Sequence, residues 1–350
     1  MSRMETRADT TARHPARHRA SNTRNHTSSG QGAWRWLAPV LAGSAAAAGA
    51  AVLYNRKRTG EAEHETPPIG QFMTVDGVLL HYIERGTGDP VVLIHGNGTM
   101  IQDFTVSGLV DRLAANHRVI VIDRPGYGYS SRPRGLWTPR AHATLFKAAL
   151  ERLGVKDATV MGHSWGTLVA VALALDSPSL VRGLVLASGY YYPTLRADTF
   201  LFSPPAIPVV GDAMRHTISP LVGRAILPAL VKQMFAPARV THRFDELFPK
   251  EMMLRPVQLR AAAEDAALMT PTVVELQHHY RELRMPVTII TGADDQIADV
   301  GRHSDRLHRE LPHSELITLP GLGHMVHHLA PDAVANAIEK TAERARMIEG

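Results

Sequence analysis

The sequence predicts an α/β protein in which helices cover both faces of a mostly parallel sheet, with an inserted set of helices and an N-terminal membrane-anchor helix. Three observations carry this prediction. Short apolar runs of strand character alternate with helical stretches on either side of residues 190–285, where the alternation stops. The strand–turn–helix around Gly162-His163-Ser164-Trp165-Gly166 lies at the centre of the first part. An uncharged stretch near the N-terminus is long enough to cross a bilayer.

The composition is that of a globular protein with ample chain for a core: 350 residues, 45% hydrophobic and 20% charged. The absence of cysteine excludes disulfides, thiolate catalysis and cysteine-ligated zinc. The pI of 9.6 is due to residues 1–60, which hold ten Lys/Arg against two acidic residues. The remaining 290 residues hold 28 basic and 31 acidic residues, so no nucleic-acid-binding surface is expected.

The N-terminal segment reads as three parts. Residues 1–33 are polar and Arg-rich and are expected to be a disordered basic tail. Residues 34–55 are a candidate single transmembrane helix, with nineteen uncharged residues from Trp36 to Tyr54 and aromatic residues at both ends. A cleaved signal peptide and a soluble Ala-rich helix are the alternatives. Residues 56–70 read as a linker, and the excess of Arg before the span favours a catalytic domain on the extracytoplasmic side.

Residues 71–189 are expected to form the first part of the core. It opens with a hairpin, because Asp76-Gly77 favours a tight turn between two strand-like runs. Each later strand is apolar on both faces, as buried parallel strands are. The expected strands are Phe72–Val75, Val78–Ile83, Val91–Ile94, Arg118–Asp123, Ala158–Met161 and Leu184–Ala187, and the expected helices are Val106–Ala115, Pro139–Leu153 and Thr167–Leu175.

Residues 190–285 are expected to form a helical cap, since they contain several prolines and no convincing strand. Its predicted helices are Pro220–Phe235, Val257–Leu268 and Pro271–Leu283. Residues 286–350 resume the alternation and complete the core, with strands Pro286–Thr291 and Ser314–Leu319 and helices Arg302–Leu311 and Pro331–Met347.

The residues with catalytic chemistry follow strands of this core. Ser164 stands at the tip of a glycine turn, and a serine needs a base and an orienting group to act as a nucleophile. His324 is the candidate base and Asp295 the candidate orienter, each on a loop after a late strand. Asp294 is a rival that triad logic alone does not exclude. The alternative is a purely structural role, in which Ser164 caps the helix that follows it, and Asp294 and Asp295 cap a helix starting near Ile297.

An acyl-transfer site also needs fixed N–H donors for the oxyanion. The backbone N–H of Trp165, directly after the nucleophile, is one candidate. The other is Asn97 in His95-Gly96-Asn97-Gly98, after the third strand, whose side chain is a further candidate donor. The alternative is an ordinary glycine turn at this position.

These motifs, together with Asp123-Arg124-Pro125-Gly126-Tyr127-Gly128-Tyr129-Ser130, resemble in order and spacing those of the α/β-hydrolase superfamily, over residues 71–350. The resemblance implies the α/β-hydrolase fold, a cap formed by the inserted helices, and Asp295 in preference to Asp294. Ser164 departs from the epoxide hydrolases and haloalkane dehalogenases, which carry Asp at this turn, although Asn97 is similar to the dehalogenase loop.

The predicted activity is therefore that of a membrane-anchored serine hydrolase acting on a carboxylic ester, lactone or related small-molecule acyl compound. Alternatives are a C–C bond hydrolase, perhydrolase or lyase using the same triad, and a non-catalytic ligand-binding protein of the same fold. This chemistry needs no metal and no organic cofactor. The pairs His278-His279 and His327-His328 are interpreted as surface or packing histidines, because no accompanying ligand is visible in the sequence.

Overall fold

The computed structural model describes residues 31–194 and 204–349. All but the last three residues of the predicted basic tail, 1–33, therefore lie outside the described residues. The chain comprises two compact units, Met1–Ala47 and Ala48–Gly350, and the candidate site lies wholly within the second.

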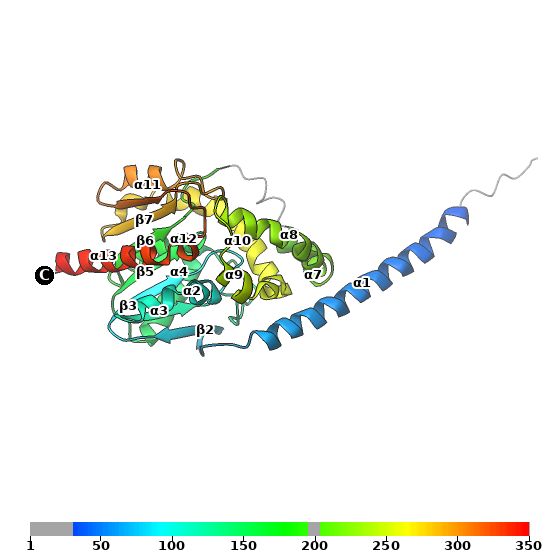
Figure 1. Ribbon diagram of the computed structural model, residues 1–350. Coiled ribbons are helices and arrows are strands. Elements are labelled where there is room, and N and C mark those ends of the chain that lie inside the picture. Colours follow the sequence, from blue (N-terminus) through cyan, green and yellow to red (C-terminus); the bar gives the residue numbers. More distant parts are fainter. Residues whose placement is uncertain (1–30, 195–203, 350) are drawn as a thin grey trace, which may run out of the picture. The chain divides into compact units, whose positions relative to one another are not determined.

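The second unit is built on one eight-stranded sheet with the order β1-β2-β4-β3-β5-β6-β7-β8 (Figure 1). β1 and β2 form an antiparallel hairpin, β2 pairs antiparallel with β4, and all later neighbours pair in parallel. The predicted mostly parallel α/β architecture is confirmed. The strands are β1 (Gln71–Val75), β2 (Val78–Arg85), β3 (Asp89–Ile94), β4 (His117–Ile122), β5 (Ala158–His163), β6 (Val181–Ala187), β7 (Val287–Gly292) and β8 (Glu315–Leu319).

Helices cover both faces of the sheet, and successive strand residues supply the two cores. In β3, Val92 and Ile94 pack on one side while Val91 and Leu93 pack on the other. This is why the central strands are apolar on both faces. The first core includes α4 (Pro139–Arg152), α5 (Gly166–Asp176) and α11 (Ser304–Glu310), and the second includes α2 (Gln102–Ser107), α3 (Leu109–Leu113), α12 (Val326–Leu329) and α13 (Pro331–Glu349).

The single helix expected over Val106–Ala115 is wrong in its boundaries. The structure has two short helices, α2 and α3, separated by Gly108 with a left-handed φ of 82°. Glycine adopts this conformation without steric strain, so the chain changes direction there. Asp103 lies in the first turn of α2 and is buried.

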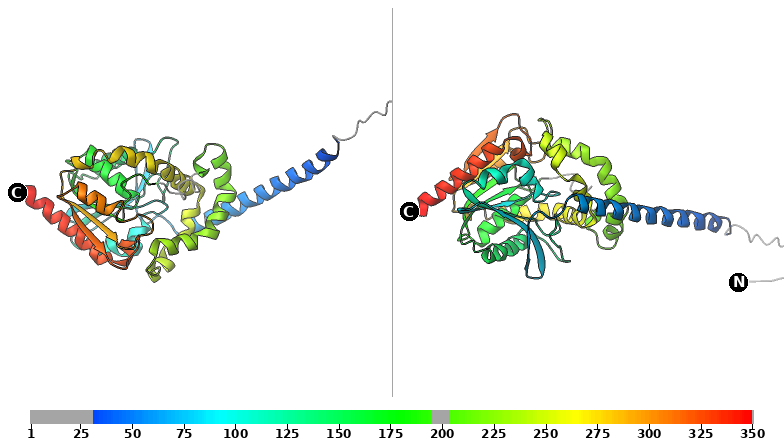
Figure 2. Two further views of the ribbon diagram at one scale, coloured as in Figure 1. Left: turned by 90° about the horizontal axis from the view of Figure 1, so that it is seen from above. Right: turned by 60° about the horizontal axis from the view of Figure 1, so that its bottom comes forward.

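Between β6 and β7 the described residues form helices and no strand (Figure 2). Two helices predicted separately, Val257–Leu268 and Pro271–Leu283, are in fact largely one helix, α10, which accommodates Pro271. Thr272, Val273 and Leu276 are buried beyond the proline, so tertiary packing maintains the helix past it. The elements are η1 (Pro204–Ala206), α7 (Val210–His216), α8 (Ile218–Phe235), α9 (His242–Leu247), η2 (Lys250–Leu254), α10 (Pro256–Leu276) and η3 (Tyr280–Glu282).

The N-terminal helix α1 (Gln31–Glu65) is longer than predicted. Its segment Leu37–Glu65 is long and apolar enough to span a membrane: its most apolar 18-residue window has a mean hydropathy of 1.6, and no residue of that window is buried. The prediction of a linker over residues 56–70 is wrong for 56–65, which are helical. Salt bridges within the helix and a buried Ala62 stabilise this end.

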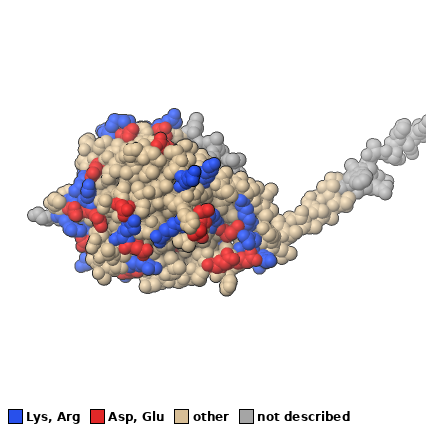
Figure 3. All heavy atoms as spheres, in the orientation of Figure 1, with Lys and Arg blue, Asp and Glu red and all other residues tan. Residues whose placement is uncertain are grey.

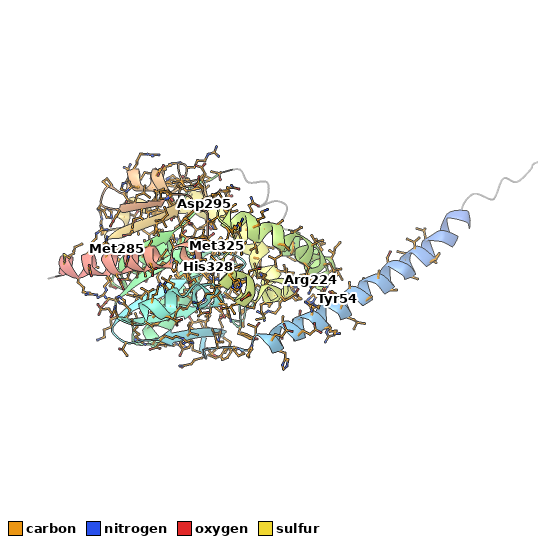
Figure 4. All side chains as sticks on the ribbon, viewed as in Figure 1. Tyr54, Arg224, Met285, Asp295, Met325 and His328 are labelled. Atoms are coloured by element: carbon orange, nitrogen blue, oxygen red, sulfur yellow. The ribbon has the colours of Figure 1, made fainter. Side chains whose placement is uncertain are left out.

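The C-terminal end of α1 is bonded to the inserted helices. The Asn55 side-chain amide donates to the carbonyls of His216 and Thr217 at 3.1 and 2.7 Å, at the end of α7. Arg224 of α8 donates to Asn55 Oδ1 at 3.0 Å, and its guanidinium lies 5.3 Å from the ring centroid of Tyr54 (Figure 4). These contacts show why the chain does not form a free linker here.

On the face drawn in Figure 3, basic and acidic side chains of the second unit are interspersed, with no large area of one sign. The excess of positive charge in the sequence belongs to the first 60 residues.

Candidate active site

Ser164 occupies a sharp turn between β5 and α5, at the carboxyl end of a central strand. Its φ is +54°, a left-handed conformation rare for serine, and its N–H donates to the Ala187 carbonyl at 2.9 Å. The flanking positions Gly162 and Gly166 leave no room for a side chain. A Cβ at Gly162 would lie 2.5 Å from the Gly166 carbonyl oxygen, and one at Gly166 would lie 2.3 Å from the Ile94 oxygen. The turn therefore presents the serine hydroxyl above the sheet edge.

His324 lies between Ser164 and Asp295. Its Nε2 is 2.9 Å from Ser164 Oγ, and its Nδ1 is 2.8 Å from Asp295 Oδ2. The three residues come from loops after β5, β7 and β8, which end at the same edge of the sheet. Asp295 is labelled in Figure 4 on the side facing α8 and α10. A proton on Nδ1, directed to Asp295, leaves the Nε2 lone pair available to the serine hydroxyl.

The geometry separates the two neighbouring aspartates, which the sequence did not. Asp294 is exposed and accepts a hydrogen bond from the Gly321 N–H at 3.1 Å, away from His324. The second oxygen of Asp295 accepts from the N–H groups of Ile297 and Ala298 at 2.8 and 2.9 Å. Burial raises the pKa of Asp295, but His324 and these N–H donors outweigh it, so the pKa lies below its usual value. Asp295 is thus ionised at neutral pH and also caps the following segment.

The loop after β3 packs directly on the serine turn. A Cβ at Gly96 would lie 3.1 Å from Ser164 Cβ, so a side chain there would push the serine by a few tenths of an ångström. Asn97 follows it, and the N–H of Trp165 lies at the N-terminus of α5. The Asn97 amide already donates to the Ala262 carbonyl at 3.1 Å, and its oxygen lies 2.7 Å from Tyr127 OH, whose single proton it shares with Asp265. Its side chain is therefore engaged with its neighbours, which argues against the expected role as an extra donor.

A buried ion-pair network that sequence reasoning missed connects this loop to α10. Arg124 donates to the carbonyls of His95 and Gly96 at 3.0 and 2.8 Å and to Asp265 Oδ2 at 2.6 Å. Arg132 donates to Asp265 Oδ1 at 3.0 Å, and all three charged side chains are fully buried. The motif containing Arg124 was visible in the sequence, but nothing near Asp265 identified it as the partner.

Two buried tyrosines and the two histidine pairs of the sequence have different surroundings. Tyr191 and Tyr192 are buried and pack edge-on against Tyr280, between the core and the inserted helices. His278 is exposed. His327 and His328 are both buried, so they are not surface residues. They lie against Asp103, a carboxylate that precedes them by more than 220 residues.

The profile of the alpha/beta hydrolase fold family matches residues 89–331. The chain belongs to the α/β-hydrolase fold family. This α/β-hydrolase is 29% identical over 284 residues to the uncharacterized protein Rv2715 of Mycobacterium tuberculosis, covering 78% of this chain and 81% of that protein. It is 29% identical over 274 residues to haloalkane dehalogenase 2 of the same organism, covering 74% and 90%.

Among solved structures, a thermophilic esterase from Thermogutta terrifontis superimposes with a TM-score of 0.64 at 22% identity, covering 79% of this chain and 99% of the esterase. At this identity the similarity establishes the fold alone. The family and the relatives' names together identify the chain as a hydrolase of the α/β fold.

Proposed function

We propose that this α/β-hydrolase is a serine hydrolase that cleaves a carboxylic ester, lactone or related acyl compound through an acyl-enzyme. The observation that carries the proposal is the position of the His324 imidazole, 2.9 Å from Ser164 Oγ and 2.8 Å from Asp295 Oδ2. A base that is itself held by a buried carboxylate is what a serine hydroxyl requires to become a nucleophile.

In the proposed reaction, Ser164 Oγ attacks the acyl carbon while His324 Nε2 takes its proton. The imidazolium that forms is stabilised by Asp295, which stays ionised. The backbone N–H groups of Asn97 and Trp165 are the proposed donors to the oxyanion. His324 then returns the proton to the leaving alcohol, and water repeats the sequence on the acyl-enzyme. The serine at this turn favours an acyl-enzyme over the aspartyl ester that an Asp nucleophile would form.

The test is covalent labelling of the full-length protein in detergent by a fluorophosphonate, with the Ser164→Ala variant as control. The wild type should be labelled and should hydrolyse simple acyl esters, and the variant should lose both while keeping its unfolding temperature. A wild type that is not labelled would refute the proposal. A series of esters of graded acyl length then identifies the preferred substrate.

We further propose that α1 anchors the enzyme in a membrane with the catalytic unit on the extracytoplasmic side, as the excess of Arg before the span favours. Because the chain contains no cysteine, one introduced thiol reports its location without background. Leu136 is 73% exposed on the catalytic unit, so Leu136→Cys in intact cells should react with a membrane-impermeant maleimide. Labelling only after lysis would place this unit in the cytoplasm.

A further inference from the structure

Four buried side chains with metal-binding chemistry meet behind the serine turn. Asp103 comes from α2, His327 and His328 from α12, and His163 from the end of β5. Asp103 Oδ1 is 3.1 Å from His327 Nε2 and 2.9 Å from His328 Nε2. His163 Nδ1 is 3.9 Å from the other carboxylate oxygen, Oδ2. The relative exposure of these residues is 0–7%, so bulk water does not reach the cluster.

The polar atoms of this cluster are poorly satisfied by protein neighbours. Within the described part of the chain, four of its buried atoms lack a well-formed hydrogen bond: Asp103 Oδ2, His163 Nδ1 and His327 Nδ1 have no partner, and His327 Nε2 lies 3.1 Å from Asp103 Oδ1 outside hydrogen-bond geometry. Buried polar atoms without partners are rare in native proteins, and each unexplained one suggests an absent ion or water. Here these four atoms belong to three residues that touch one another.

We propose that Asp103, His327 and His328 bind a divalent transition-metal ion, with Zn²⁺ the ion best suited to them. Their donor atoms all lie within 4.8 Å of one another. A tetrahedral Zn²⁺ with bonds of about 2.0 Å separates its ligand atoms by about 3.3 Å, close to the two short separations in the cluster. Two imidazoles and one carboxylate are a ligand set that zinc takes in proteins, and one that non-haem Fe(II) shares.

The ion would have a structural role, because the cluster is closed to solvent and no reaction step depends on it. His163 precedes the nucleophile, and its Nε2 lies 3.1 Å from the His324 carbonyl oxygen. His327 and His328 follow His324 within four residues. Holding α12 against Asp103 would therefore fix the loop that carries His324 relative to the serine turn. The inference is independent of the substrate proposed above.

The test uses the full-length protein in detergent, purified without a polyhistidine tag and dialysed against a chelator. One equivalent of Co²⁺ should bind and give visible absorption bands that differ from those of aqueous Co²⁺. Zn²⁺ should displace the Co²⁺ and raise the unfolding temperature. His327→Gln and Asp103→Asn should each weaken metal binding at least tenfold. The matched control, His278→Gln with His279→Gln, removes a histidine pair outside the cluster and should bind as the wild type does.

Absence of stoichiometric Co²⁺ uptake by the folded wild type would overturn the proposal, whether or not the variants fold. Uptake that the control pair abolishes and the cluster variants retain would also overturn it, since the ion would then bind elsewhere. Fluorophosphonate labelling of the metal-free and metal-loaded protein keeps this test separate from that of the proposed activity, because the label reports on Ser164 alone.

Discussion

Asp265 on α10 is the residue whose removal should most damage the fold near the site. Its carboxylate accepts hydrogen bonds from Arg124 at 2.6 Å, from Arg132 at 3.0 Å and from Tyr127 OH at 2.8 Å. Asp265→Ala would leave two fully buried guanidinium groups without their shared counter-charge. Asp265→Asn would keep the shape and remove only the charge.

The expected loss of stability is about 3–5 kcal/mol, the range for breaking a buried ion pair by removing one partner. Three lost bonds to a charged acceptor, at about 1.5–3 kcal/mol each, would exceed this. The loss is smaller because Arg124 keeps the carbonyls of His95 and Gly96, and Arg132 keeps Glu264. For a unit of this size, with an unfolding entropy of about 2.1 cal/mol/K per residue, the unfolding temperature should fall by roughly 5–8 °C.

The stabilisation contributed by the Asp265 carboxylate decreases at acidic pH. Burial raises the pKa of Asp265, but Arg124 and Arg132 lower it more, so the folded-state pKa is below its unfolded value of about 3.9. The carboxylate therefore contributes its full stabilisation above about pH 4, and this is lost as the pH falls through the folded-state pKa. The stability difference between wild type and Asp265→Asn should be constant near neutral pH and shrink below that point.

Chemical and thermal unfolding of the full-length protein in detergent measures this loss. Asp332→Asn is the control, since Asp332 pairs with Arg112 on the surface and its side chain is 78% exposed. That change should alter stability by less than about 1 kcal/mol. If Asp265→Asn were no more destabilising than Asp332→Asn, the network would not stabilise the fold as argued.

Two further pairs of variants test the site. Asp295→Asn should lower kcat by roughly 10³–10⁴-fold, because the imidazole of His324 loses the partner that sets its tautomer. Asp294→Asn should keep kcat within a few-fold of wild type. Equal effects of the two changes on ester hydrolysis would contradict the assignment of Asp295. Gly166→Ala places a Cβ 2.3 Å from the Ile94 oxygen and should abolish folding or lower the unfolding temperature sharply. At Gly60 an added Cβ would have no atom within 4 Å, so Gly60→Ala should stabilise α1 by about 0.5–1 kcal/mol. Comparable unfolding temperatures for these two alanine variants would contradict the packing described.

The sequence predicts the parts of this fold that depend on local patterns. Apolar runs mark each parallel strand, and Asp76-Gly77 marks the hairpin, whose φ values of 49° and 80° are those of a tight turn. The order of the motifs then places Ser164, Asp295 and His324 at one sheet edge. Propensity alone failed where tertiary contacts decide: α10 continues past Pro271, and α1 continues to Glu65.

Contacts between residues far apart in the chain could not be predicted from the sequence. His327 and His328 were visible as a pair, but their carboxylate partner, Asp103, lies on the short helix α2, which ends at Gly108. Likewise, nothing around Asp265 in the sequence shows that it neutralises Arg124. Both ion pairs depend on the three-dimensional path of the chain, which brings residues far apart in the sequence together. Local sequence patterns do not contain the distance between such residues.

One of the inserted helices, α10, is hydrogen-bonded to the two residues proposed as oxyanion donors. Trp165 Nε1 donates to the Asp265 carbonyl at 3.0 Å, and the Asn97 amide donates to the Ala262 carbonyl, so both residues proposed as oxyanion donors are bonded to α10. Displacing α10 would break these bonds together with the buried ion pairs of Asp265. A displacement of α10 would therefore disturb both proposed oxyanion donors at once. The preorganisation of the proposed oxyanion donors then depends on contacts between the loops of the sheet and the inserted helix α10.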